Sequence, residues 1–287
     1  MTFHHDEIDF DAFFNPKRLA MIGATPNPDK WGYMILSNII NGGFKGEIYP
    51  VNPKHDKILD IKCYPSIAEI PSTIDLAVIS TPVNSVMTVV DECIKKSIPA
   101  AIVITSGFSE TGQEGLKSER ILVQKARDGG MRLMGPNTMG LFSAKSSLTA
   151  LMPATKPSSG NVSMVSQSGN VGTQLMGWGV QVGIGFSRFV SSGNEGDITC
   201  MDYVQNFASD EDTKVIFVYM ESLKKARLDP GKIREVVKKK PILVFKGGKT
   251  KMGLLAAASH TGAIAGSLDI YEGYFRQSGM IEIKSTL

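Results

Sequence analysis

The stretch Leu19-Ala-Met-Ile-Gly23 decides the fold class, because it is apolar throughout and ends on a glycine. A short run of this kind is typical of a strand that is buried on both faces. Comparable runs follow at residues 48–52, 76–80, 100–105 and 132–135, and helical segments are predicted at 31–40, up to Lys96, and at 114–127. Apolar strands that alternate with helices form a parallel sheet covered on both sides. The sequence therefore predicts an α/β protein whose residues 1–152 form a Rossmann-like domain.

The segment Met152-Pro-Ala-Thr-Lys-Pro-Ser-Ser-Gly160 interrupts this alternation, since it holds two prolines and no apolar periodicity. Such a segment is typical of a linker. Beyond it, strands are predicted at 162–165, 188–191, 215–220, 242–245 and 281–283, and helices at 169–182, 199–208 and 267–277, with a further helix that ends at 238–240. We expect residues 160–287 to form a second doubly wound domain, of the flavodoxin-like kind.

The composition excludes several classes of protein. The 287 residues are 42% hydrophobic and 21% charged, which is ordinary for a soluble globular chain, and the net charge of +3 is too small to indicate a nucleic-acid partner. No apolar run is long enough to span a bilayer. Three cysteines lie far apart and form no CxxC pair, which argues against a zinc site or a disulfide framework. We expect a cytoplasmic protein without a metal site of its own.

Small, polar or glycine residues follow each predicted strand of the first domain. Ligands of open parallel sheets lie at this carboxyl edge. Any one of these loops has an ordinary explanation as a turn, but five at one edge predict a binding site. The candidate ligand-binding residues are Gly23, Thr25, Lys30, Asn52, Lys54, Thr81, Pro82, Ser106, Gly107 and Asn137.

The nature of the ligand follows from two departures from an NAD site. The loop at residues 23–32 does not have the GxGxxG pattern, and Lys54 stands where an NAD site has an acidic residue. A lysine after the second strand suits a phosphate. The sequence therefore favours a ligand with a phosphate on its ribose, either NADP or coenzyme A.

In the second domain, His260 lies within residues 256–266, where its neighbours are small and two glycines follow it closely. This pattern is typical of a loop that carries a nucleophilic imidazole; the alternative is a core histidine. Ser168 and Gly169 begin a predicted helix, whose exposed N–H groups attract anions such as phosphate. Glu221 ends a strand and is suited to hold one imidazole nitrogen. The alternatives are a helix cap for Ser168 and a surface salt bridge for Glu221.

Five segments resemble a known family when they are taken in order. They are Phe14-Asn-Pro-Lys-Arg-Leu-Ala-Met-Ile-Gly-Ala24, Tyr49-Pro-Val-Asn-Pro-Lys54, Gly135-Pro-Asn137, Ser166-Gln-Ser-Gly169 and Ser259-His-Thr-Gly262. The chain is similar to the α part of the NDP-forming acyl-CoA synthetases, and closer to the ADP-forming acetyl-CoA synthetases than to succinyl-CoA synthetase. The resemblance runs from about Phe13 to the end. One departure is Thr138, where the family usually has a cysteine.

The resemblance implies a function for both domains. The first would bind coenzyme A, and the second would carry a phosphohistidine at His260, with Ser168 and Gly169 on the phosphoryl group and Glu221 steadying the ring. The reaction would convert acyl-CoA, phosphate and ADP into a carboxylic acid, CoA and ATP. No ATP-binding motif is visible, so an ATP-grasp β subunit or domain would bind the nucleotide and Mg²⁺.

Two alternatives to this function remain open from the sequence. One is a CoA-sensing regulatory module, related to the N-terminal part of protein lysine acetyltransferases. The other is an NADP-dependent oxidoreductase. His260 favours the synthetase, because the sensing modules often lack the histidine.

Overall fold

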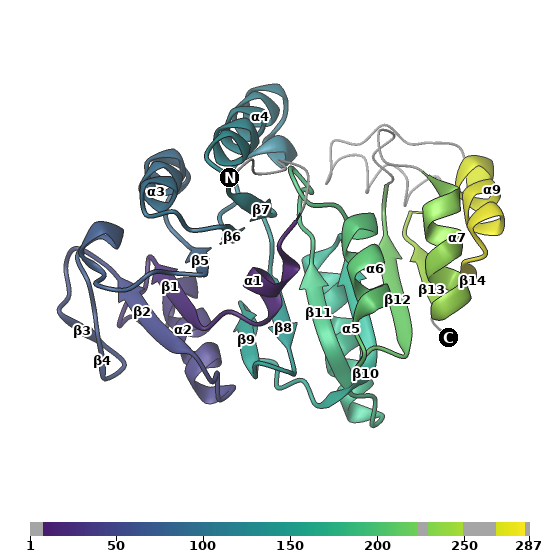
Figure 1. The fold of residues 1–287 in the computed structure, drawn as a ribbon, viewed down its shortest axis with the longest axis horizontal. Helices are drawn as coiled ribbons and strands as arrows, with labels where there is room; N and C mark the ends of the chain where they lie inside the picture. Colours follow the sequence, from purple (N-terminus) through teal and green to yellow (C-terminus); the bar gives the residue numbers. More distant parts are fainter. Residues whose placement is uncertain (1–7, 223–228, 249–267, 285–287) are drawn as a thin grey trace.

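The computed structural model describes residues 8–222, 229–248 and 268–284 (Figure 1). Its first sheet has five strands, all parallel. Their spatial order is β2 (Glu47–Val51), β1 (Arg18–Ile22), β5 (Leu76–Ile79), β6 (Ala100–Val103) and β7 (Arg132–Met134). The winding direction reverses between β1 and β5, because β2 lies on one side of β1 and the later strands on the other. The parallel sheet predicted from the apolar runs is confirmed.

Helices cover both faces of this sheet, as its apolar strands require. Ile22 packs in one cluster with α3 (Val83–Lys95) and α4 (Gln113–Asp128), whereas its neighbour Met21 packs in another with α2 (Trp31–Asn41). Successive side chains of a strand point to opposite faces, so the two clusters lie on the two sides of the sheet. The predicted helices at 31–40 and 114–127 therefore exist, each within one residue of its predicted bounds.

The second sheet has seven strands, of which five are parallel. In spatial order they are β14 (Ile281–Ile283), β13 (Ile242–Lys246), β12 (Val215–Met220), β10 (Ser159–Ser166), β11 (Phe186–Ser191), β8 (Gly140–Ser143) and β9 (Leu148–Leu151). Here the winding reverses between β10 and β12. Its five parallel strands therefore have the same order as those of the first sheet, and the flavodoxin-like prediction is confirmed.

Alternation along the strands again assigns the helices to faces. Met164 packs with α5 (Gly169–Gln181), and Val165 packs in the cluster that holds α6 (Cys200–Ser209), α7 (Pro230–Lys239) and α9 (Leu268–Ser278). In Figure 1, α6, α7 and α9 stand in front of the sheet. Within the described ranges, no helix is both long and apolar enough to cross a membrane.

The hairpin β8–β9 was not predicted, and it crosses the predicted boundary between the domains. Residues 140–151 precede the linker, yet β8 pairs antiparallel with β11 of the second sheet. The sequence also gave no signal for α1 (Phe10–Phe14), β3 (Lys57–Ile58) and β4 (Ile61–Lys62). The two-residue strands β3 and β4 each hold a single apolar residue, and the five residues of α1 are too few to show a helical repeat.

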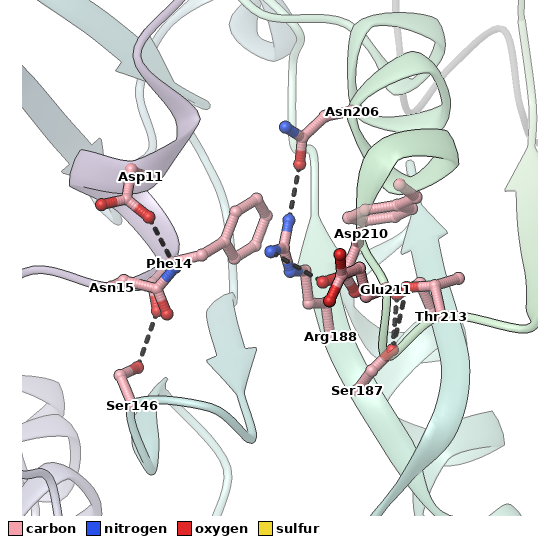
Figure 2. Close-up of polar contacts among 12 residues, drawn as sticks. Asp11, Phe14, Asn15, Ser146, Ser187, Arg188, Asn206, Asp210, Glu211 and Thr213 are labelled. Carbon is pink, nitrogen blue, oxygen red and sulfur yellow. Dashed lines mark hydrogen bonds and ion pairs between the residues drawn. The ribbon is translucent and has the colours of Figure 1, made fainter.

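The N-terminal helix α1 joins the two sheets. The carbonyl of Phe14 accepts a hydrogen bond from Ser146 Oγ at 2.7 Å, in the turn between β8 and β9. Its ring lies 4.4 Å from the guanidinium carbon of Arg188, which donates to Asn206 at 2.7 Å and pairs with Asp210 at 3.1 Å (Figure 2). The same ring meets Tyr203 edge-on. One apolar core therefore runs from the first sheet through α1 to α6 of the second.

A buried carboxylate links the two sheets through ion pairs and a hydrogen bond. Asp197, which precedes α6, is fully buried and accepts from Arg127 and Arg132 and from the N–H of Leu133 at 2.8 Å. Burial opposes its ionisation, but the bonds from Arg132 and Leu133 and the charge of Arg127 outweigh it and hold the pKa of Asp197 below its ordinary value. All three partners belong to the first sheet or its helix α4.

Candidate functional site

The first candidate region lies where the winding of the first sheet reverses, at the carboxyl ends of β1 and β5. Gly23 has a φ of +87°, and a Cβ at this position would lie 2.3 Å from the carbonyl oxygen of Ser80. A Cβ at Gly32 would lie 2.0 Å from the carbonyl oxygen of Gly23. Both positions therefore require glycine, and the first turn of α2 is pressed against the end of β1. Open sheets of this type bind their ligands at such a reversal.

Asn52 joins the loop after β1 to the loop after β2. Its Nδ2 donates to the carbonyl of Ala24 at 2.7 Å, and its Oδ1 accepts from the N–H of Lys54 at 2.9 Å. The side chain is therefore committed to backbone and serves to place the loops. Lys54 and Lys30 are both exposed, and Lys30 stands at the start of α2. Thr25 Oγ1 accepts from the N–H of Asn27 at 3.3 Å.

The side-chain hydroxyl of Thr81 is suited to a bound ligand. Its Oγ1 is buried and has no hydrogen-bond partner among the residues that the structure describes. Its carbonyl accepts from Thr105 Oγ1 at 2.7 Å, which ties the ends of β5 and β6 together. Pro82 follows and precedes the first turn of α3. A buried hydroxyl without a partner is rare in proteins, and a bound polar ligand would satisfy it. This region therefore fits a phosphate-bearing ligand such as coenzyme A.

The remaining predicted residues of the first edge lie on the loops after β6 and β7. Ser106 is exposed, but the N–H of Gly107 donates to Glu110 Oε1 at 2.5 Å. Asn137 donates its N–H to the carbonyl of Thr105 at 3.0 Å and its Nδ2 to Asn194 Oδ1 at 3.1 Å. Gly107 and the side chain of Asn137 are thus held by the protein itself, and the sequence did not predict Glu110 or Asn194 as partners.

The second candidate region lies where the second sheet reverses, between β10 and β12, and Gln167 holds it together. Its Oε1 accepts from the N–H groups of Glu221 at 2.7 Å and Ser222 at 2.8 Å, and its Nε2 donates to the carbonyl of Ser222 at 2.8 Å. Its own N–H donates to Tyr219 at 3.1 Å. Sequence reasoning assigned no role to Gln167. It therefore fixes Glu221 beside the start of α5.

Ser168 and Gly169 begin α5, as predicted. Ser168 Oγ accepts from the N–H of Val171 at 3.4 Å, so this serine caps the helix, and Ser166 Oγ donates to the carbonyl of Ser168 at 2.6 Å. A Cβ at Gly169 would lie 2.2 Å from Met139 Cγ. The helix start is therefore packed tightly against the residue that precedes β8, with its N–H groups at the carboxyl edge of the sheet.

Glu221 acts on Tyr219, two residues earlier on the same side of the strand. Burial, the charge of Glu221 and a hydrogen bond with that carboxylate raise the pKa of Tyr219 to about 12. Tyr219 therefore stays protonated at neutral pH and bonds to Glu221. Sequence reasoning missed Tyr219, although the period of two along a strand could have placed it on the same side as Glu221. His260, the predicted nucleophile, lies outside the described residues.

Thr138, the departure from the family pattern, is buried between the two sheets. Its Oγ1 donates to the carbonyl of Ser191 and accepts from the N–H of Gly140 at 3.0 Å. The hydroxyl therefore fastens the start of β8 to the end of β11. In this chain the position has a structural role that a threonine performs through two hydrogen bonds.

Family models match both halves of the chain. Residues 17–144 match a CoA binding domain, and residues 159–287 match a succinyl-CoA ligase like flavodoxin domain. Two doubly wound units of these kinds, in this order, define a CoA ligase α-type chain. The chain belongs to the family of the NDP-forming acyl-CoA synthetases, of which it corresponds to the α part.

Individual relatives agree with this class. The chain is 44% identical to the acetate–CoA ligase [ADP-forming] I subunit alpha of Pyrococcus furiosus, over 96% of this chain and 60% of the relative. It is 38% identical to a 4-hydroxybutyrate–CoA ligase [ADP-forming] of Nitrosopumilus maritimus, over 94% of this chain and 39% of the relative. The structure superposes with a TM-score of 0.93 on an acetyl-coenzyme A synthetase of Ca. Korarchaeum cryptofilum in complex with phosphate and ADP, which is 43% identical, over 97% of this chain and 60% of that one. The chain thus spans three fifths or less of these relatives.

Proposed function

We propose that this chain is the CoA-binding, phosphohistidine-carrying α part of an ADP-forming acyl-CoA synthetase, which converts acyl-CoA, phosphate and ADP into a carboxylic acid, CoA and ATP. One observation carries the proposal: two winding reversals of the same chain each hold a group suited to one half of this chemistry. The first offers exposed lysines and a buried hydroxyl that has no partner in the described part of the chain, and the second offers a capped helix start beside a fixed carboxylate.

The first edge would bind CoA. Lys30 and Lys54 would pair with its phosphates, and the backbone at Gly23 and the hydroxyl of Thr81 would meet its polar groups. Glycine at position 23 allows the close approach that a ligand at this loop needs. Asn52 would act through the loops that it joins.

The second edge would transfer the phosphoryl group. Attack by inorganic phosphate on the thioester releases CoA and forms an acyl phosphate. A neutral His260 nitrogen would then attack phosphorus; the bond to the acyl oxygen breaks, the carboxylate leaves, and ADP later takes the phosphoryl group from the histidine. The start of α5 at Ser168 and Gly169 would stabilise the negative charge that the histidine gains. Glu221, steadied by Gln167 and Tyr219, would hold the N–H of the imidazole.

The rest of the assembly follows from the same proposal. An ATP-grasp β subunit or domain would bind ADP or ATP with Mg²⁺, because the chain carries no nucleotide motif of its own. We propose a CoA-binding domain at residues 1–152 and a phosphohistidine domain at 160–287, and the hairpin at 140–151 extends the sheet of the second domain. A reducing cytoplasm suits the three cysteines, which are buried and unpaired. The relatives do not single out one carboxylic acid, since those named for acetate and for 4-hydroxybutyrate are 44% and 38% identical over 96% and 94% of this chain.

A phosphorylation experiment tests the proposal. The chain is mixed with an ATP-grasp partner subunit and ATP labelled at its terminal phosphate, and acid-labile label on the chain is measured. Wild type should take up label, and His260→Asn should take up none. Label on the His260→Asn protein at the wild-type level would show that the nucleophile lies elsewhere. A chain that binds CoA but takes up no label would support the sensing module instead.

A further inference from the structure

Asn194 lies in a turn that sits between the two sheets, at residues 191–196, called the bridging turn below. The N–H of Asn194 donates to the carbonyl of Pro136 at 2.9 Å, and the N–H of Gly196 donates to the carbonyl of Gly135 at 3.0 Å. A Cβ at Gly193, whose φ is +63°, would lie 2.5 Å from the carbonyl oxygen of Pro136. The turn is therefore seated directly on the loop that follows β7 of the first sheet.

The side chain of Asn194 draws two loops of the first edge together. Its Oδ1 accepts from Asn137 Nδ2 at 3.1 Å, and its Nδ2 donates to Glu110 Oε2 at 2.5 Å and to Glu119 Oε2 at 2.9 Å. The other oxygen of Glu110 accepts from the N–H of Gly107 at 2.5 Å. Bonds to backbone and to Asn194 hold the pKa of Glu110 below its ordinary value against its partial burial. An uncharged amide suits this position, because it offers two donors and an acceptor at once.

The other side of the bridging turn holds the second edge. The N–H of Ser192 donates to the carbonyl of Ser166 at 2.8 Å, and its Oγ donates to Glu195 Oε1 at 2.8 Å, within the turn. Ser166 Oγ in turn donates to the carbonyl of Ser168, the cap of α5. A continuous set of hydrogen bonds therefore runs from Gly107 and Asn137 through Asn194 and its turn to the start of α5.

We propose that Asn194 is a positioning residue that sets the loops after β6 and β7, at the CoA-binding edge of the first sheet, at a fixed distance from the phosphoryl-binding helix start of the second. The inference rests on the function proposed above. Phosphate attacks the thioester at the end of CoA, and the phosphoryl group then passes to the histidine. The two edges must therefore be held at a fixed distance from each other. A misplacement of about 1 Å costs on the order of a hundredfold in rate. Glu110 takes part because its carboxylate accepts hydrogen bonds from both Asn194 and the N–H of Gly107.

Asn194→Asp tests the proposal with almost no change in size. It places a carboxylate oxygen where the donor faced Glu110 and Glu119, so repulsion replaces two hydrogen bonds. We expect the Kd for CoA, measured by calorimetry, to rise about tenfold, and kcat with the partner subunit to fall at least as much. Glu110→Gln alone turns a second amide toward Asn194. It should raise the Kd for CoA and lower kcat by a smaller factor, about threefold each.

The double variant Asn194→Asp with Glu110→Gln distinguishes a positioning role from a general loss of stability. The double variant restores a donor opposite an acceptor, with the roles exchanged, although Glu119 still faces the new carboxylate. We expect it to recover at least threefold in Kd and in kcat over Asn194→Asp alone. A general loss of stability would not be rescued in this way. Lys125→Ala is the control: it removes a charge pair between α4 and Asp91 of α3, at 2.5 Å, and should leave both constants within twofold.

The outcomes separate this proposal from the proposed function. If wild type binds no CoA, both fail. If wild type binds CoA and both single variants stay within twofold of it in Kd and kcat, the proposed function stands and Asn194 positions nothing. If the double variant is no better than Asn194→Asp, the contact with Glu110 does not carry the effect and the proposal is overturned.

Discussion

The two winding reversals of this chain are alike in topology and opposite in how their polar groups are used. At the first, between β1 and β5, the lysines are exposed and the hydroxyl of Thr81 has no partner in the described part of the chain. At the second, between β10 and β12, Gln167 is hydrogen-bonded to the backbone of Tyr219, Glu221 and Ser222. A site that binds and releases a large ligand keeps side chains available to it. A site that directs the transfer of a charged group benefits from dipoles that are already fixed.

The largest expected effect breaks the first region. Gly23→Ala puts a Cβ 2.3 Å from the carbonyl of Ser80 at a φ of +87°, so strain and overlap add, and we expect the free energy of unfolding to fall by about 3 kcal/mol. CoA binding should fall with it. Urea denaturation and calorimetry measure the two losses.

Gly43→Ala is the control for this comparison. Gly43 also has a positive φ, +76°, but among the described residues nothing beyond its chain neighbours lies within 4 Å of the position of a Cβ there. It should cost about 1 kcal/mol and leave CoA binding intact. Equal losses for both variants would show that overlap with Ser80 plays no part.

The next effect breaks the second region. Gln167→Leu leaves the N–H groups of Glu221 and Ser222 without their acceptor, which should lower the free energy of unfolding by about 2 kcal/mol. Phosphoryl uptake with the partner should fall by more than tenfold, since Glu221 is no longer fixed. The affinity for CoA should stay the same. Gln174→Leu, an exposed glutamine on α5, is the control. Normal phosphoryl uptake by Gln167→Leu would contradict the role given to Gln167.

A smaller effect sharpens the account of the first region. Lys54→Ala should raise the Kd for CoA about tenfold, through one lost charge-assisted hydrogen bond. The loss should shrink at high salt, because an exposed pair is screened. If Lys54 pairs with the ribose phosphate, the same substitution should not change the Kd for dephospho-CoA. Lys57→Ala, which removes an exposed pair with Asp60 at 2.8 Å, should change neither. An unchanged Kd for CoA would remove Lys54 from the site.

The smallest effect belongs to the second region. Tyr219→Phe removes one hydrogen bond to Glu221 and keeps the ring, so we expect a loss of about 1 kcal/mol in stability and a few-fold fall in phosphoryl uptake. Because the pKa of Tyr219 is about 12, the tyrosine is protonated throughout the range from pH 6 to 9. The ratio of variant to wild-type rate should therefore be constant over that range. A ratio that changes with pH would show that the hydroxyl of Tyr219 titrates within that range, against this prediction.

Much of the fold could be predicted because its signals are local. The apolar runs located the ten parallel strands of the two described sheets, and Ser168 stood where a helix was expected to start. The residues after each strand were expected at one edge, and Gly23 and Thr81 do lie side by side there. What local signals did not indicate is how each side chain is used: Asn52 and Asn137 were predicted to bind ligand, yet both donate to the protein.

The sequence by itself determined the class of sheet, the edge proposed for ligand binding and the family, because apolar periodicity, turn residues and short motifs are properties of neighbouring residues. Only the tertiary structure decided which strand ends are neighbours and that the hairpin at 140–151 extends the second sheet. It alone brought Asn194 to Glu110 and Asp197 to Arg132, across 84 and 65 residues of chain. The physical reason is that strand order and buried polar pairs depend on which apolar faces cover one another, and that is settled by the whole core at once.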